Sequence, residues 1–161
     1  MAALSAVVSG NTAWQKVQKG LSSASPAAQE AFRSLKIYLA NQALNPQLNV
    51  AFFSQADTSA STTGTLLGTG TPKLYASYVK KGTTATLTFF KIADDVTGTN
   101  APSTWKIGMN LTGAGDESYY TNYNPTAYVS GIAVVCHTTF TGATIATGAT
   151  TACDGFVIYS V

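Results

Sequence analysis

Charged residues are scarce in this sequence. Asp, Glu, Lys and Arg make up only 10% of its 161 residues, whereas soluble domains average about 25%. The net charge is +2, and no run of Lys and Arg forms the basic footprint that binding to nucleic acid requires. We therefore expect no nucleic-acid partner. Because interface cores are depleted in charge, the composition favours a chain in lasting contact with neighbouring proteins, although secreted β domains share this composition.

Long apolar segments are absent as well. No stretch reaches the ~18 consecutive apolar residues of a membrane-spanning helix. No Lys or Arg precedes the short apolar run at residues 2–8, as one would in a secretion signal. We expect no membrane partner, and a protein that is soluble or bound to a particle.

Histidine and cysteine are rare too. His137 is the single histidine, and Cys136 and Cys153 are the two cysteines. A structural zinc site needs four ligands, so we expect no metal and no cofactor. The cysteines could form a disulfide if they face each other across a hairpin, but two buried free thiols fit a reducing cytoplasm better. Cys136 and His137 cannot form a catalytic pair, because adjacent strand residues point to opposite faces.

Paired carboxylates are the remaining candidates for chemistry. Asp94-Asp95 and Asp116-Glu117 could serve a glycosidase or a calcium site. Each pair lies in a Gly-rich turn, where Asp is favoured for local backbone hydrogen bonds, and the spacing of a calcium loop is missing. The Gly- and Thr-rich residues 63–71 lack the Gly-Lys-Ser/Thr of a phosphate loop. We infer that the protein is not an enzyme and expect no small-molecule substrate.

The first 45 residues predict an N-terminal arm and one α-helix. Residues 1–24 are interpreted as an extended arm with a short helix at 13–18, without a core of its own and separable from the rest of the fold. Ser25 followed by Pro26 is a helix-start signal, and Asn45-Pro46 ends the helix. The residues expected on its buried face are Ala28, Phe32, Leu35 and Leu39. A second apolar flank with Ile37 and Tyr38 predicts that the helix is covered on more than one side.

The N-terminal segment is also the basic part of the chain. Residues 1–45 carry Lys16, Lys19, Arg33 and Lys36 against Glu30, which gives +3. The rest of the chain has five basic and six acidic side chains, which gives −1. The segment therefore either lies on an acidic surface or presents a solvated helix face.

After Pro46 the pattern changes to period 2, which predicts a second, mainly β domain over residues 46–161. Residues 74–80 and 83–92 are expected to form a hairpin around Lys81-Gly82, with Leu87 and Phe89 on an apolar face and Thr88 and Phe90 on a hydroxylated one. The predicted strands are 48–54, 65–67, 74–80, 83–92, 105–111, 128–138 and 155–161. The fold class is thus mainly β: an antiparallel β-sandwich or jelly-roll-like domain preceded by an arm and one α-helix.

Aromatic residues gather in one region of the sequence. Tyr119, Tyr120, Tyr123 and Tyr128 follow Trp105 within 24 positions. Such a group is typical of a sugar-stacking platform, of the anchors of a protein interface, or of the rim of a sandwich. All five residues are therefore candidates for an interface or a ligand site.

Three runs resemble small virion proteins of tailed bacteriophages. They are TLTFFKIADD at 86–95, SGIAVVCHTT at 130–139 and DGFVIY at 154–159, set in a background rich in Thr, Ala and Gly. The resemblance covers about the C-terminal half and implies a β-rich subunit present in many copies. Such a subunit is most often a capsid decoration (cement) protein, and otherwise a head-fibre or tail component.

We accordingly expect a virion protein, assembled in the host cytoplasm, that binds copies of itself and the major capsid protein. On this interpretation the arm and helix clamp neighbouring capsid subunits. The candidate capsid contacts are Trp14, Lys16, Lys19 and Phe32. The alternative is a tail or fibre subunit that binds host-surface carbohydrate through the region from Tyr119 to Tyr128.

Overall fold

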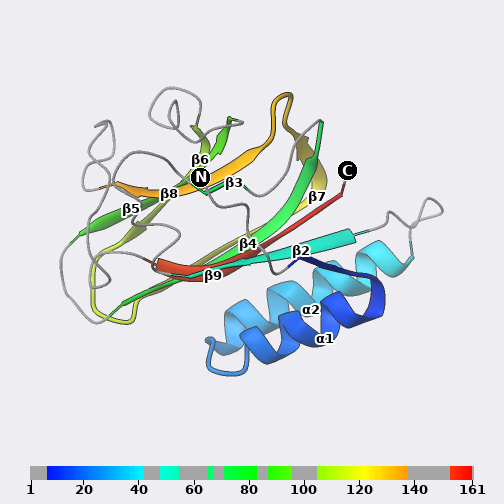
Figure 1. The fold of residues 1–161 in the computed structure, drawn as a ribbon. Coiled ribbons are helices and arrows are strands. Elements are labelled where there is room, and N and C mark those ends of the chain that lie inside the picture. Colours follow the sequence, from blue (N-terminus) through cyan, green and yellow to red (C-terminus); the bar gives the residue numbers. More distant parts are fainter. Residues whose placement is uncertain are drawn as a thin grey trace.

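The computed structural model describes residues 7–41, 48–54, 65–66, 71–82, 87–95, 105–137 and 153–160. These residues form three layers, in which a pair of helices covers one face of an antiparallel sheet and a second antiparallel sheet covers its other face (Figure 1). The predicted mainly β class with N-terminal helical structure is confirmed. The elements are β1 (Val7–Ser9), α1 (Gly10–Gly20), α2 (Pro26–Ala40), β2 (Leu48–Phe53), β3 (Thr65–Leu66), β4 (Lys73–Lys81), β5 (Thr88–Asp94), β6 (Trp105–Leu111), β7 (Glu117–Ala127), β8 (Ile132–His137) and β9 (Cys153–Ser160).

Helix α2 starts where the sequence predicts. Ser25 is its N-cap, with the side-chain oxygen accepting a hydrogen bond from the amide of Ala28 at 3.2 Å, and Pro26 opens the first turn. All four residues predicted for its buried face are buried. The second flank is only partly covered. Ile37 is 56% exposed, whereas Tyr38, 38% exposed, packs against the ring of Tyr123 at 4.7 Å.

Helix α1 is longer than the short helix predicted within the arm. It spans eleven residues rather than the six expected at 13–18. Ala13 and Val17 are buried one turn apart, and Leu21 and Ala24 continue this buried face into the turn before α2. The arm is therefore packed against the sheet over this length, because its small and apolar residues recur at helical spacing.

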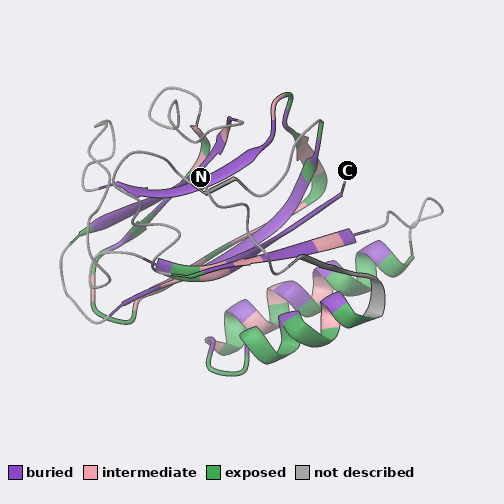
Figure 2. Cartoon of the chain, viewed as in Figure 1, coloured by how far each residue is buried: buried purple, intermediate pink, exposed green. Residues whose placement is uncertain are grey.

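The middle layer has strand order β1-β2-β9-β4-β7. Successive residues of its strands alternate between two apolar clusters. Val50 and Phe156 join the cluster beneath the helices, while Ala51 and Val157 join the cluster between the sheets. The inner strands β2, β4 and β9 are buried on both faces, which explains why they are mostly apolar, whereas the edge strand β7 is more exposed (Figure 2).

A bulge in β4 sets the facing of its side chains. Leu74 pairs with Tyr159 and Ala76 pairs with Ile158, so Tyr75 is an extra residue. Tyr75 and Ala76 therefore both join the helix-side cluster. Further along β9, a Cβ on Gly155 would collide with the carbonyl oxygen of Tyr78, so this position accepts only glycine.

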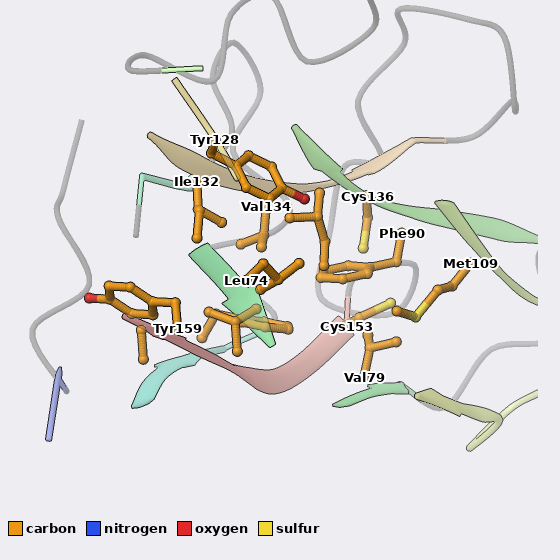
Figure 3. Packing of buried hydrophobic residues seen from close by; sticks show 14 of the residues in the cluster. Leu74, Val79, Phe90, Met109, Tyr128, Ile132, Val134, Cys136, Cys153 and Tyr159 are labelled. Carbon is orange, nitrogen blue, oxygen red and sulfur yellow. The ribbon is translucent and has the colours of Figure 1, made fainter. Parts of the chain in front are cut away.

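The outer sheet has strand order β3-β8-β5-β6. Its inward residues meet those of the middle sheet in one core, in which Phe90, Val134 and Cys136 face Leu74 and Cys153 (Figure 3). The pairing also corrects the hairpin prediction. β4 pairs with β7 and β9, whereas β5 pairs with β6 and β8, so Lys81-Gly82 leads from one sheet to the other.

The predicted hydroxylated face of β5 is wrong as well. Thr88, Phe89 and Phe90 are all buried, while Leu87 is 42% exposed. Both faces of the strand are covered, so its alternation between apolar and hydroxyl side chains does not separate core from solvent. Residues 83–86, which were assigned to the same strand, lie outside the described residues.

Strand β7 was not predicted, because its residues are mostly polar. Ala76 pairs with Thr121 and Leu74 with Thr126, so residues 122–125 bulge out of the ladder. The bulge is closed by a hydrogen bond of 2.9 Å from the amide of Asn124 to the side-chain oxygen of Asn122. β8 likewise begins at Ile132 rather than at the predicted Tyr128.

Candidate interaction site in the groove between the two helices

A groove of about 560 Å³ lies between α1 and α2. Its floor is apolar, and exposed side chains such as Gln18 and Lys36 lie at its mouth, so it opens to solvent. The residues that line it are Trp14, Val17, Gln18, Leu21, Ser22, Gln29, Phe32, Arg33, Lys36, Ile37 and Ala40.

Helical spacing generates the two walls. Trp14, Gln18 and Leu21 recur at intervals of three or four residues, and so do Arg33 and Ile37 on α2, which places each set on one stripe of its helix. The side-chain amide of Gln29 was not singled out by the sequence. It donates to the carbonyl oxygens of Leu21 at 3.0 Å and Ala24 at 3.2 Å, and so ties α2 to the turn that ends α1.

The charged side chains that line the groove are both basic, Arg33 and Lys36. Glu30 is the only acidic residue between positions 10 and 40. It pairs with Arg33 at 2.9 Å, with the two side chains 62% and 66% exposed. Even with Glu30 counted, Arg33 and Lys36 leave the rim with a net charge of 2 − 1 = +1, so the rim is basic.

The four predicted capsid contacts divide into two groups. Trp14 is half-buried in the wall of the groove and Phe32 is buried in its floor, 2% exposed. The Phe32 ring packs edge-on against Phe156 at 5.4 Å. Lys16 and Lys19 are exposed but do not line the groove. The structure therefore brings Trp14 and Phe32 together and leaves the two lysines elsewhere on α1.

Two of the predicted tyrosines pack against α2. Tyr119 is 38% exposed and its ring lies 6.4 Å from that of Phe32. Tyr123, carried by the bulge of β7, is 44% exposed and lies 4.7 Å from the ring of Tyr38. These contacts fasten α2 to the edge of the middle sheet.

The other aromatic candidates lie apart from this pair. Tyr120 packs against the core between the sheets, and its hydroxyl accepts a hydrogen bond from Asn122 at 2.8 Å. Tyr128 is fully buried, and burial raises its pKa. Trp105 is half-buried beside Ala93 on the outer sheet. The five aromatic residues therefore do not form one platform.

The cysteines and the histidine are held in the interior. Cys136 and Cys153 form no disulfide, and both are buried in the same core cluster, as expected, although they come from different sheets rather than from a hairpin (Figure 3). A hydrogen bond with Cys136 raises the pKa of Cys153, and burial raises it further. Burial, with the nearby charge of Lys91, lowers the pKa of His137 to about 4. A buried thiol that stays protonated and a buried, weakly basic imidazole are poorly suited to nucleophilic chemistry.

The paired carboxylates make structural hydrogen bonds. Asp116 accepts from the amide and the hydroxyl of Thr112, both at 2.9 Å, which is the local turn bonding predicted for it. Asp94 instead bonds amides 35 and 36 positions away. Glu117 accepts from the amide of Ser25 at 2.9 Å and from the hydroxyl of Tyr78 at 2.8 Å, and so joins the start of α2 to the sheet.

No group of three or more His, Cys, Asp or Glu residues able to hold a metal ion occurs within the described part of the chain. Among the same residues, neither helix has the length and apolar character needed to cross a bilayer. No protein-family model, characterised protein or solved structure matches the chain. The geometry of the groove therefore carries the functional argument.

Proposed function

We propose that the chain is a structural protein of a bacteriophage particle, a capsid decoration (cement) protein that attaches through its helix layer. The observation that carries the proposal is the apolar groove between α1 and α2, with Trp14 in its wall and a basic rim. Interface cores are enriched in Trp and Arg and in desolvated apolar surface. The resemblance of the β-strand sequences to small virion proteins is the reason for proposing a bacteriophage particle as the assembly to which the chain belongs.

The charge distribution favours different partners for the helix layer and for the β sheets. The helical segment carries +3 and the rest of the chain −1. A nearly neutral β body favours association with further copies of the chain, while the basic helix layer favours a different, acidic neighbour. Copies of itself and the major capsid protein are accordingly the proposed partners.

A non-enzymatic role is part of the proposal. Asp94, Asp116 and Glu117 all accept hydrogen bonds from backbone amides. His137 and the two cysteines are buried. The groups that most often serve as acids, bases and nucleophiles are thus used to hold the fold, which favours a role in assembly over catalysis.

Copy number in purified particles tests the proposal. Particles are isolated from a lysate of the producing host, and the chain is quantified by mass spectrometry against the major capsid protein. A decoration protein is expected at a copy number on the order of hundreds, since it follows the symmetry of the head. Absence of the chain from the particles would overturn the proposal.

The second candidate is a tail or fibre subunit that binds host-surface carbohydrate. It is favoured by the exposed faces of Tyr119 and Tyr123, because aromatic faces stack on sugars. The same measurement separates the two, since a tail component is expected at roughly a small multiple of three or six copies per particle.

A further inference from the structure

The geometry points to an acidic, amphipathic helical segment of a neighbouring virion protein as the occupant of the groove between α1 and α2; this inference rests on the proposed function. The apolar floor is formed by Val17, Leu21 and Phe32, which are at most 5% exposed. Above them stand Trp14 and Ile37, and Ile37 is 56% exposed. A partner that inserts apolar side chains here would cover Ile37, the more exposed of the two large apolar side chains on the outer flank of α2, Ile37 and Tyr38.

The backbone favours a helical occupant over a β-strand. A peptide that binds as a β-strand adds main-chain hydrogen bonds to a sheet edge. The groove is walled by two helices, whose main-chain groups bond within each helix and leave no ladder to extend. The α2 wall runs from Gln29 to Ala40, which at the rise of a helix is about 16 Å. A helix of about three turns fits this length.

The charges favour an acidic occupant and oppose a second copy of this helix layer. Both charged residues of the lining are basic. The α1–α2 pair as a whole contains four basic residues and one acidic residue. Two such layers brought together would place like charges opposite each other, which is unfavourable at an interface. Carboxylates that flank the apolar stripe of a partner helix would instead meet Arg33 and Lys36.

Two synthetic peptides test this inference on the full chain. Both have the same leucine spacing for one apolar face over about four helical turns. One carries Glu and the other Lys at the flanking positions, and each is labelled for fluorescence anisotropy. We expect the Glu peptide to bind about tenfold or more tightly than the Lys peptide at low salt. Equal affinity, tighter binding of the Lys peptide, or no binding of either would overturn the inference.

Matched charge variants locate the binding. Arg33→Glu with Lys36→Glu, and Lys16→Glu with Lys19→Glu, each replace two exposed lysine or arginine side chains by glutamate, but only the first pair lines the groove. The first variant should lose the preference for the Glu peptide, by about tenfold. The second should retain that preference. Equal loss in both would mean that net charge, and not the groove, selects the peptide.

A third variant tests the apolar wall of the groove. Trp14→Ala should weaken both peptides while preserving the preference for Glu, and unchanged affinity would contradict the groove as the site. Circular dichroism confirms that each variant is folded.

The peptide titrations use no particles, so they test the acidic-helix inference separately from the proposed function. A chain found at high copy number that binds neither peptide would overturn the acidic helix and leave the proposed function standing.

Discussion

At the scale of single residues, Asp94 shows how a charged group is used in this fold. Its carboxylate accepts hydrogen bonds from the amides of Val129, at 2.9 Å, and Ser130, at 2.8 Å. It also pairs with Lys106 at 3.0 Å. Burial alone would raise the pKa of Asp94, but these hydrogen bonds and the lysine lower it to about 2. The carboxylate thereby fixes the turn that leads into β8.

This arrangement predicts a pH-dependent stability. The pKa of Asp94 is lower in the folded state, about 2, than its ordinary value of 3.8. The stabilisation of the fold by the Asp94 carboxylate is therefore complete above about pH 4. It is lost as the pH falls from about 4 to about 2. The shift corresponds to about 2 kcal/mol. Urea unfolding should show that Asp94→Asn is less stable than the native chain by this order at pH 7, and that the difference shrinks towards pH 2.5. A constant difference would contradict the assignment.

The individual site residues were only partly predictable. The exposed fraction of an aromatic side chain depends on which elements pack over it, and sequence spacing does not contain this information. Trp14 lies in the wall of the groove, whereas Phe32 forms its floor and Tyr128 is wholly buried. Gln29 was missed because its role depends on two carbonyl oxygens of a turn whose geometry no local motif specifies.

At the scale of elements, β7 and α2 are joined by aromatic contacts. Tyr119 meets Phe32 and Tyr123 meets Tyr38. We expect Tyr119→Ala combined with Tyr123→Ala to lower the free energy of unfolding by about 1–3 kcal/mol, because each ring contributes burial and an edge contact. The control is the double replacement by Phe, which keeps both rings and should change stability by less than about 0.5 kcal/mol. Urea unfolding measures both.

The same variants address carbohydrate binding. If the Ala variant lost binding on a glycan array while its unfolding curve stayed unchanged, the two rings would serve a ligand rather than the α2 contact. That result would favour the fibre alternative. Loss of stability without any glycan binding in the native chain would assign the rings to packing.

The N-terminal segment is expected to be part of the folding unit. The sequence alone predicts that residues 1–24 are separable, but Val17 and Leu21 pack in one cluster with Val50 and Phe156 of the sheet. Deleting residues 1–24 should therefore expose this face and destabilise the fold by more than about 3 kcal/mol. Lys16→Ala with Lys19→Ala changes only exposed side chains of the same segment and should be neutral. A truncated chain with the native unfolding midpoint would contradict this packing.

The elements differ in how far local pattern determines them. α2 was predictable because cap, proline and apolar spacing agree. Most strands were predictable from β-branched and aromatic alternation. The hairpin predicted around Lys81-Gly82 does not form, because β4 and β5 pair with other strands in different sheets. A Lys-Gly pair is compatible both with a tight turn between two paired strands and with a crossing between two sheets, so the local sequence does not distinguish them. β7 escaped prediction because a strand at the edge of a sheet, with a four-residue bulge, needs few apolar residues.

At the scale of the whole molecule, the three layers separate two kinds of surface. The middle sheet is covered on both sides, so the basic helix pair lies on one outer face of the molecule (Figure 1). The apolar groove between α1 and α2 lies within that layer. This arrangement would let the β body contact other copies while the helices face a different protein.

Site-specific photo-crosslinking in assembled particles tests this account most directly. Gln15 and Gln18 are both exposed on α1, but only Gln18 lines the groove. A benzophenone side chain is placed at one position or the other, the particles are irradiated, and the cross-linked peptides are identified by mass spectrometry. We predict that position 18 captures an acidic segment of another virion protein and that position 15 captures much less. Particles that incorporate both variants normally, with no capture from position 18 beyond that from position 15, would contradict attachment through the groove.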